Sequence, residues 1–257
     1  MTARPAPQLR LQAVDLGSDV HTHSTWTDGA DGLGSMADAA VAAGLHTWGI
    51  SDHVRTDSTW LPEYVAEVRA LHRDGLTVRC GVEVKMLDDR GHLDLPADLP
   101  PLDLVLVADH QFPGVDGPVH PREVASAVTT GRTPAAAVVE RVVLATAAAV
   151  RRSPAPTVVA HLFSLLPKCA VDEQDLEPAL LADLLAELAA ACRAADAAVE
   201  ANEKWGCPAS GVLVTLADAG VRIVAGSDAH RAADVGRFDR VLDALGRPAQ
   251  AGARRSP

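Results

Sequence analysis

Seven short apolar runs, separated mainly by segments with helical periodicity, constrain the fold of this chain more than any other feature. The runs lie at residues 16–22, 47–51, 77–84, 102–108, 157–160, 197–201 and 221–225. Strands that alternate with helices form βαβ units, in which the strands run parallel. The length of 257 residues suits one α/β barrel, and no segment has the character of a linker. The sequence therefore predicts a single α/β domain of parallel strands.

Helical segments connect most of these runs. They cover residues 36–43, 62–73, 134–151, 175–195, 208–219 and 239–245. Segment 175–195 is the clearest, because its leucines recur at the spacing of one apolar helix face. The connection 111–132 differs, since it contains three prolines and three glycines. Connections of this length usually carry function or move, so we expect an irregular loop there.

The two ends of the chain are predicted to be flexible tails, residues 1–14 and 246–257. The predicted barrel domain therefore covers residues 15–245. The first residues lack the apolar stretch of a secretory signal. No apolar run approaches the length of about 18 residues that a membrane span requires, so we expect a cytoplasmic protein that contacts no membrane.

Charge and composition exclude several classes of site. The formal net charge is −11, and aromatic residues make up 3% of the chain. A protein that binds long nucleic acids needs a basic face or aromatic platforms for the bases, so this function is not expected. The cysteines form no Cys-X-X-Cys pair, which favours small buried side chains over a zinc–thiolate site. They are Cys80, Cys169, Cys192 and Cys207.

Residues that can bind metals gather at one end of the predicted strands. His21 and His23 end the first strand one residue apart, and alternate side chains of a strand share a face. Five of the seven strands deliver a histidine at or just past their carboxyl ends, and the third carries Glu83. With nearby carboxylates the set is His21, His23, Asp28, His53, Glu83, His110, His161, Asp228 and His230. α/β barrels keep their active sites at this edge, and such imidazoles and carboxylates suit Zn, Mn or Fe.

Six short motifs surround these residues, and their order is more specific than any one of them. They are DVHTHSTWTDG at 19–29, GISDH at 49–53, GVEV at 81–84, VADH at 107–110, VAHLF at 159–163 and AGSDAH at 225–230. This series resembles the motifs of the PHP (polymerase and histidinol phosphatase) family over residues 19–237. The resemblance implies a distorted seven-stranded (β/α)7 barrel, similar to a TIM barrel, with a cluster of three divalent metal ions.

The resemblance also implies which residues hold each ion. The first would be held by His21, His23, Glu83 and Asp228. Glu83 would bridge to a second ion, held by His110 and His161. The third would be held by Asp28, His53 and His230. Each of these positions carries a suitable donor, so an intact centre with two or three ions (Zn, Mn or Fe) is expected.

Hydrolysis of a phosphate ester is the activity that the resemblance implies. Neighbouring divalent ions lower the pKa of a bridging water, so that hydroxide would attack phosphorus between the first two ions, with Glu83 and Asp228 as catalytic ligands. Arg55 and Arg231 follow ligand histidines closely, and we expect both to bind the phosphate and assist catalysis. Lys168 and Arg237 are further candidates for contacts with the substrate.

Other residues are expected around the ions without binding them. Asp52 and Asp109 directly precede ligand histidines and are candidates to orient the imidazoles. Pocket contributions are also expected from loops 55–61, 87–93 and 111–132, and from His92, His120, Asn202, Glu203 and Trp205.

The preferred function is hydrolysis of a small phosphomonoester, as in histidinol phosphatases. A phosphodiesterase or 3′-5′ exonuclease of the same family is the alternative, although the acidic charge weighs against long nucleic acids. An amidohydrolase also begins with His-X-His, but uses a modified lysine on its fourth strand, where this chain has Asp109 and His110. Lys85 on the third strand keeps that alternative open. A non-catalytic metal-binding module is disfavoured by the complete ligand set.

Overall fold

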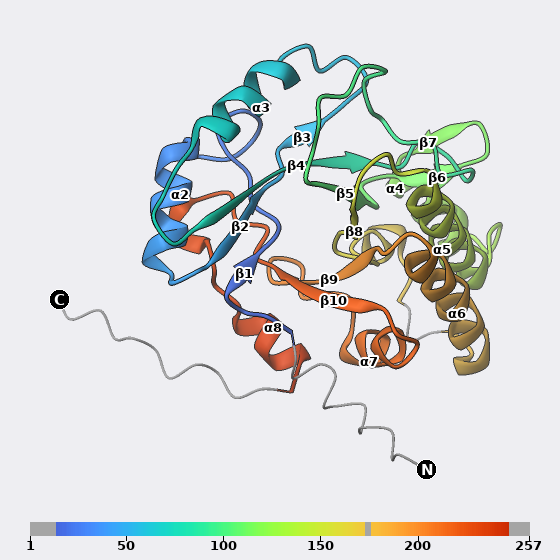
Figure 1. Ribbon diagram of the computed structural model, residues 1–257. Coiled ribbons are helices and arrows are strands. Elements are labelled where there is room, and N and C mark those ends of the chain that lie inside the picture. The colour runs from blue at the N-terminus through green and yellow to red at the C-terminus, as the bar shows by residue number, and fades with distance from the viewer. Residues whose placement is uncertain (1–13, 173–175, 247–257) are drawn as a thin grey trace.

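The computed structural model describes residues 14–172 and 176–246, which form a barrel of mostly parallel strands surrounded by helices (Figure 1). Seven strands are hydrogen-bonded in the order β1-β2-β4-β5-β8-β9-β10, and neighbours in this path are parallel. Their bounds are β1 Ser18–Asp19, β2 Thr47–Ile50, β4 Thr77–Lys85, β5 Leu104–Ala108, β8 Thr157–Val159, β9 Ala198–Asn202 and β10 Arg222–Gly226. Each corresponds to one predicted apolar run, which confirms the α/β barrel.

Main-chain hydrogen bonds between the first and last strands close the barrel. The N–H of Val20 donates to the carbonyl of Ala225 at 3.2 Å, just past the short strand β1. Farther along, the N–H of Asp228 donates to the carbonyl of His21 at 2.8 Å. These bonds hold the first and last metal-binding motifs side by side.

Six helices occupy the predicted positions and cover the outside of the barrel. They are α2 Leu33–Ala42, α3 Leu61–Ala70, α5 Ala135–Arg152, α6 Pro178–Ala194, α7 Ser210–Asp218 and α8 Asp239–Ala244. The predicted start of α6 at Asp175 lies outside the described residues. The leucine stripe is buried at Leu184, Leu185 and Leu188, whereas Leu180 is exposed. The stripe prediction therefore holds for the C-terminal part of the helix.

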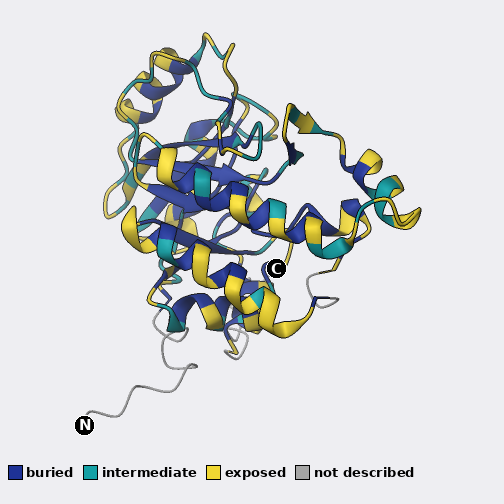
Figure 2. Cartoon of the chain, turned by 90° about the vertical axis from the view of Figure 1, so that its right-hand side faces the viewer, coloured by how far each residue is buried: buried dark blue, intermediate teal, exposed yellow. Residues whose placement is uncertain are grey.

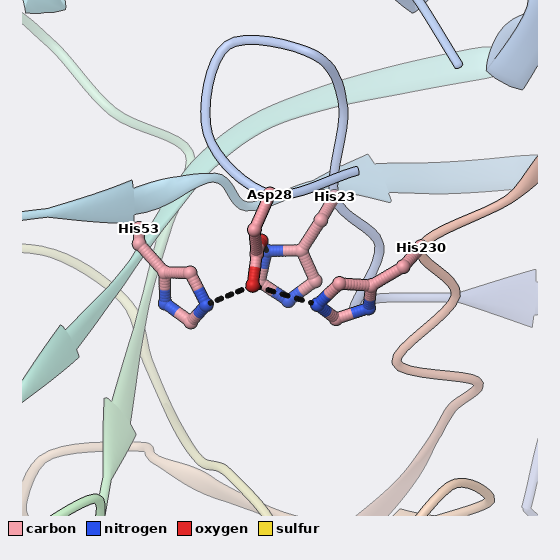
Figure 3. A group of neighbouring side chains, drawn as sticks. All are labelled: His23, Asp28, His53 and His230. Atoms are coloured by element: carbon pink, nitrogen blue, oxygen red, sulfur yellow. Dashed lines mark hydrogen bonds and ion pairs between the residues drawn. The ribbon is translucent and has the colours of Figure 1, made fainter. Parts of the chain in front are cut away.

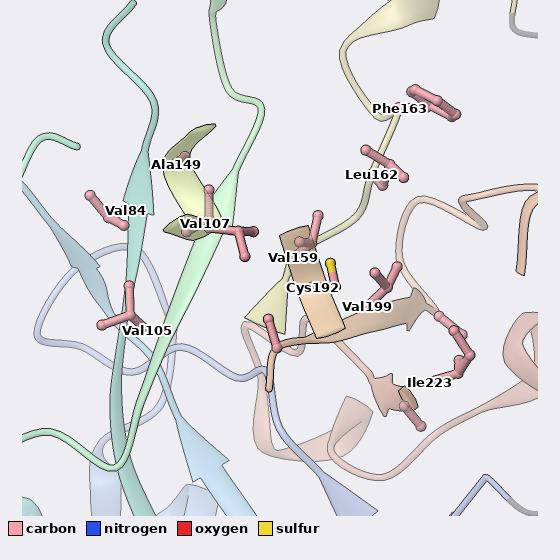
Figure 4. Close-up of a cluster of buried hydrophobic side chains, with 14 of the residues drawn as sticks. Val84, Val105, Val107, Ala149, Val159, Leu162, Phe163, Cys192, Val199 and Ile223 are labelled. Atoms are coloured by element: carbon pink, nitrogen blue, oxygen red, sulfur yellow. The ribbon is translucent and has the colours of Figure 1, made fainter. Parts of the chain in front are cut away.

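The core lies between the outer face of the strands and the helices. Figure 2 shows helices whose buried residues face the strands while their exposed residues face outward. Valines dominate this layer, and Val107, Val159 and Val199 from three adjacent strands lie together in Figure 4. Cys192 packs among them from α6. Cys80 and Cys169 are buried as well, and Cys207 is partly buried, in agreement with the predicted role of the cysteines.

A small apolar cluster fills the inside of the barrel. It consists of Leu104, Leu106, Ala108, Val158, Ala160 and Ala198, with Val20 and Val224 against it. Toward the carboxyl ends of the strands, glycine leaves room for polar groups. A Cβ at Gly226 would overlap the carboxylate of Glu200 and approach the Cβ of His21 to 2.9 Å. The packing of the interior therefore leaves space for the side chains of Glu200 and His21 at the carboxyl ends of the strands.

The prediction of an irregular loop at 111–132 is wrong for most of that segment. A short antiparallel hairpin, β6 Phe112–Gly114 and β7 Gly117–Val119, is followed by helix α4, Pro121–Thr129. The helix begins with proline in its first turn, a position where the missing N–H costs no hydrogen bond. His120 caps it, because its Nδ1 accepts a hydrogen bond from the N–H of Arg122 at 3.1 Å.

A further strand, β3 (His53–Val54), was missed because it has only two residues. It pairs in parallel with β4, and the register places His53 opposite Glu83. Two predicted metal ligands thus become neighbours through main-chain pairing.

Most residues of the predicted tails, 1–13 and 247–257, lie outside the described part of the chain. Val14, the last residue of the predicted N-terminal tail, is buried and belongs to the core. The domain therefore includes Val14. Among the described residues, no helix has the length and apolar character needed to cross a membrane.

Tyr64 ties α3 to the barrel, and its hydroxyl is expected to contribute to stability. The single proton of the buried hydroxyl is shared between two carbonyl oxygens within hydrogen-bonding distance, Ile50 at 3.1 Å and Gly81 at 2.9 Å. We expect Tyr64→Phe to lower the free energy of unfolding by about 1–3 kcal/mol, because buried carbonyls lose a partner. Urea denaturation measures the change, and a difference below about 0.5 kcal/mol, the usual range of surface substitutions, would contradict this role.

Candidate metal centre

All nine predicted metal ligands meet at the carboxyl ends of the strands, and Glu83 lies at their centre. Its carboxylate oxygens contact the imidazole nitrogens of five histidines. The distances are 3.3 Å to His21 Nε2, 3.3 Å to His23 Nε2, 3.1 Å to His53 Nδ1, 2.9 Å to His110 Nε2 and 2.8 Å to His161 Nε2. Two donors about 2.0–2.1 Å from one tetrahedral ion lie roughly 3.3 Å apart, so this spacing suits shared coordination.

Asp28 forms the centre of a second group near the surface (Figure 3). Its Oδ2 lies 3.4 Å from His53 Nε2 and 3.2 Å from His230 Nε2. The ring of His23 lies behind this carboxylate, with Nδ1 3.9 Å from Asp28 Oδ1. The side chain of Asp28 is 55% exposed, so this group opens to solvent while Glu83 is buried.

The donor groups overlap more than the family resemblance implies, where Glu83 alone is shared between two ions. Donor atoms within 4.8 Å of one another form four groups. These groups are His23, Asp28, His53 and His230; His21, Glu83 and His161; His21, His23 and Asp228; and His53, Glu83 and His110. His23 and His53 each belong to two groups. The nine residues therefore form one continuous centre, and the assignment of each residue to one ion remains a prediction.

Two observations test whether these residues fit metal ions. Within the described residues, Nδ1 of His23 is buried without a hydrogen-bond partner. A buried polar atom without a partner is costly unless a ligand satisfies it. The donors are imidazoles and carboxylates alone, the set that Zn, Mn and Fe accept. The centre therefore fits divalent ions of this class.

The imidazoles and carboxylates of the centre shift one another's pKa values. Burial alone lowers the pKa of His21, but the carboxylates of Glu200, Asp228 and Glu83 raise it well above its usual value. Burial also lowers the pKa of His161, yet hydrogen bonds to Asp109 and Glu83 raise it to about 10. Burial raises the pKa of Glu83, while His110 and His21 hold it well below its ordinary range. The positive charge of a protonated imidazole and the negative charge of Glu83 thus stabilise each other, as a bound cation would stabilise the carboxylate.

Glu200 orients the centre and was missed by the sequence analysis. It is fully buried on β9, and its Oε1 lies 2.8 Å from His21 Nδ1. Its Oε2 accepts a hydrogen bond from the N–H of His161 at 2.7 Å. His161 has a φ of 29°, a conformation that non-glycine residues rarely adopt without support. A single acidic residue in the apolar strand was the signal that could have revealed it.

The two aspartates predicted to orient imidazoles have different roles. Asp109 lies 3.3 Å from His161 Nδ1 and accepts a hydrogen bond from Ser164 Oγ at 2.8 Å, so it does contact a ligand ring. Asp52 instead accepts hydrogen bonds from Ser24 N at 2.9 Å and Thr27 Oγ1 at 2.6 Å. The prediction for Asp52 is therefore corrected, because it organises the loop that carries Asp28.

Replacing Glu200 is expected to weaken metal binding. Glu200→Gln keeps the shape of the side chain but removes the charge beside His21 and one acceptor near His161. Loss of such a partner costs about 10–100-fold in metal affinity. Competition with a fluorescent chelator measures this change, and Glu140→Gln, an exposed substitution on α5, serves as the control. Equal affinities of the two variants would contradict a role for Glu200.

Cationic side chains surround the centre unevenly. The centre lies in a cavity of about 810 Å³, whose lining includes Arg55 and Lys168, both named from the sequence. Arg231 and Arg237 line a separate depression of about 360 Å³, which adjoins the centre at Asp228 and His230. The structure therefore does not bring the four predicted cations together.

Two further lysines, Lys204 and Lys85, also line the main cavity. Lys204, missed in the sequence, donates to Asp228 Oδ1 at 3.1 Å. It follows β9 and lies between Glu203 and Trp205, two residues that were expected near the pocket. Lys85, the residue that kept the amidohydrolase alternative open, pairs with Asp94 Oδ2 at 3.2 Å. Its ammonium group is thus directed to a carboxylate outside the nine ligands.

Of the remaining residues expected near the pocket, one lines the cavity and others make contacts elsewhere. Trp205 lines the main cavity, and its Nε1 donates to Asp228 Oδ2 at 3.1 Å. Asn202 is buried and donates to Glu200, while Glu203 caps the start of α8 by accepting from the N–H of Arg240. His92 pairs with Asp88 at 2.7 Å.

Comparisons with known proteins agree with this architecture. The histidinol phosphate phosphatase of Lactococcus lactis, solved with zinc, L-histidinol and phosphate, superposes with a TM-score of 0.64. The identity is 18%, and the match covers 89% of this chain and 92% of that one. The putative histidinol phosphatase of Listeria monocytogenes gives a TM-score of 0.61 at 17% identity, covering 86% and 97%. At these identities the likeness concerns the fold.

Sequence relatives identify the family. The DNA polymerase/3′-5′ exonuclease PolX of Bacillus subtilis is 32% identical over 113 residues, or 39% of this chain. The match spans 20% of the length of that protein. The sequence model of the PHP domain matches residues 19–204, which include seven of the nine ligands. The chain therefore belongs to the PHP domain family.

Proposed function

We propose that this protein is a metal-dependent phosphoesterase that hydrolyses a small phosphomonoester, as histidinol phosphatases do. One observation carries the proposal. Seven of the nine side chains suited to divalent ions line the same cavity as the cations Arg55 and Lys168, and the other two, His21 and His23, are buried beside them. Several adjacent ligand groups with an accessible cavity are typical of catalytic sites, whereas structural metal sites are closed.

The metal ions would supply an activated water and neutralise charge on the phosphate. The protein would provide the rest of the site. Glu83 and Asp228 hold the ligand imidazoles in place through ion pairs. Arg55 is exposed at the cavity, where its planar guanidinium suits the paired oxygens of a phosphate. Arg231 and Arg237 are placed to reach groups beyond the phosphate, since they line the adjoining depression.

Two or three divalent ions are proposed, and zinc is the first choice to test. Zinc is present in the structure of the Lactococcus lactis phosphatase. The four overlapping donor groups provide room for more than one ion. Elemental analysis of protein loaded with Zn, Mn or Fe would count the ions, and one ion per chain would contradict a multinuclear centre.

A phosphodiesterase of the exonuclease type is the second candidate. The partial match to PolX of Bacillus subtilis favours it. The net charge of −11 opposes binding of long nucleic acids, although it does not affect small diesters in the same way. A small phosphate ester is therefore the proposed partner in either case.

A comparison of ester classes tests the proposed function. Protein loaded with Mn or Zn would be assayed with p-nitrophenyl phosphate, histidinol phosphate, bis(p-nitrophenyl) phosphate and p-nitroacetanilide. We expect the highest kcat/KM with a phosphomonoester. Preference for the diester would favour the exonuclease-type reading, and turnover of the anilide alone would favour an amidohydrolase.

A further inference from the structure

A second hollow adjoins the cavity of the metal centre. It has a volume of about 480 Å³, and its lining shares His110, Gln111 and Lys168 with the main cavity. The rest of its lining is His120, Pro121 and Arg122. A molecule that places one group at the metal centre can therefore extend another group into this side pocket.

The side pocket is cationic, and none of the described residues that line it carries a carboxylate. Arg122 is exposed, and among the described residues its guanidinium takes part in no ion pair or hydrogen bond that joins it to another side chain. Other arginines of the chain do have such partners, as Arg69 has in Asp103 and Arg141 in Asp89. An unpaired cation is notable in a protein with a net charge of −11.

Lys168 supplies the second charge and is held in position by an aromatic ring. Its Nζ lies 4.1 Å from the centre of the Trp205 ring, a cation–π distance. The Trp205 ring is itself fixed, because its Nε1 donates to Asp228. Lys168 lines both the main cavity and the side pocket.

Packing fixes the two cations relative to each other. Lys168 belongs to the short helix η1, Leu166–Cys169, which packs against α4. Arg122 lies in the first turn of α4, whose positive N-terminal end adds to the potential at the pocket. The first-turn acid Glu123 is exposed and is not part of the lining. The segment 111–132, which the sequence suggested to be a loop, thus supplies four of the six described residues that line the pocket.

We propose that the alcohol part of the substrate carries a second anionic group, a phosphate or a carboxylate, that binds Arg122 and Lys168. This inference rests on the proposed function, because the ester phosphate would lie at the metal centre. Both anions offer paired oxygens to a guanidinium and an ammonium group. By the same reasoning, esters of cationic alcohols, histidinol phosphate included, should be poorer substrates than these anionic esters, since they place like charges together.

Matched esters test the proposal on the metal-loaded protein. 3-Phosphoglycerate and glycerol 3-phosphate share a skeleton and differ by a carboxylate, and 1,3-propanediol bisphosphate and monophosphate differ by a phosphate. Phosphoethanolamine is the cationic member. We expect kcat/KM to be higher by about tenfold or more for the anionic member of at least one pair, the effect of one charged hydrogen bond. The pair that responds distinguishes carboxylate from phosphate.

Substitution of Arg122 assigns the effect to the side pocket. The ratio compared is kcat/KM for an ester of an anionic alcohol divided by kcat/KM for the matched ester of a neutral alcohol. We expect Arg122→Gln to reduce this ratio by about tenfold, as loss of a charged hydrogen bond does. Arg132→Gln is the matched control, because Arg132 is an exposed arginine just after α4 whose Nε donates to Thr130. This control should keep the wild-type ratio. Lys168→Met should also lower the ratio.

Different results contradict the two proposals. Suppose that esters of neutral alcohols are hydrolysed as fast as those of anionic alcohols. This result would overturn the anion-binding role of the side pocket and leave the proposed phosphoesterase function intact. An absence of all phosphomonoesterase activity would overturn the proposed function. In that case calorimetric titration with 1,3-propanediol bisphosphate and monophosphate still decides the pocket. Equal affinities for the two compounds, or an affinity unaffected by Arg122→Gln, would exclude it.

Discussion

Glu83→Gln is expected to abolish most phosphoesterase activity. Glu83 contacts five imidazoles and is the one carboxylate at the centre of the buried cluster. The amide keeps the size of the side chain but removes the negative charge that would join two ions. Loss of a partner behind a ligand costs up to about 100-fold, so loss of this ligand itself should exceed that value. Steady-state kinetics with p-nitrophenyl phosphate and elemental analysis measure activity and bound metal together.

A matched substitution separates this effect from a general loss of stability. Glu187→Gln changes an exposed glutamate on α6 that pairs with Arg151 far from the cluster. It should retain wild-type metal content and activity. Circular dichroism would establish that both variants are folded. A folded Glu83→Gln protein with full activity would exclude Glu83 as the bridging ligand.

Removal of the metal ions is the second change with a large expected effect. Dialysis against EDTA should abolish activity, and addition of Mn or Zn should restore it. Ions that bind the native centre more tightly than the unfolded chain would also stabilise the fold. At free metal concentrations of about 100 times Kd the gain is roughly 2.7 kcal/mol, which raises Tm. Full activity of metal-free protein would exclude a metal-dependent enzyme.

The pH dependence of metal binding follows from the same centre. The carboxylates that raise the pKa of His161 to about 10 keep its ring protonated at neutral pH, and the pKa of His21 is raised as well. A metal ion needs neutral imidazole, so binding must release these protons. Affinity should therefore weaken as the pH falls from 8 to 6, by about tenfold per unit for each proton released. Calorimetry in two buffers of different ionisation enthalpy measures the release, and a pH-independent Kd would contradict it.

Much of the fold was predictable because hydrophobic periodicity is a local property. Each of the seven apolar runs became a strand, and each predicted helix has a counterpart in the structure. The segment 111–132 was misjudged because its prolines and glycines resemble a loop. Pro121 is a first-turn proline of α4, and Gly114 and Gly117 flank the turn of a hairpin, the one as the last residue of β6 and the other as the first of β7. The same residue types occur in both settings, so composition alone does not distinguish them.

The convergence of the nine candidate metal ligands was predictable for a different reason. Parallel strands in a barrel place all their carboxyl ends at one edge, so residues distant in the sequence can be assigned to one site. The carboxylates that orient the imidazole rings of these candidate ligands were not predictable in this way. Asp52 and Asp109 both precede a histidine, but only Asp109 contacts a ligand ring, since local backbone geometry directs Asp52 toward Ser24 and Thr27.

The chain by itself determined the barrel, the edge that holds the site and the nine residues suited to metal ions, because these depend on periodicity and strand order. Tertiary structure decided which side chains share a cavity. It separated Arg231 from Arg55, introduced Glu200 beneath the histidines and brought Arg122 on α4 close to Lys168 on η1. Such neighbours arise from the packing of segments far apart in the chain, and no local pattern encodes them.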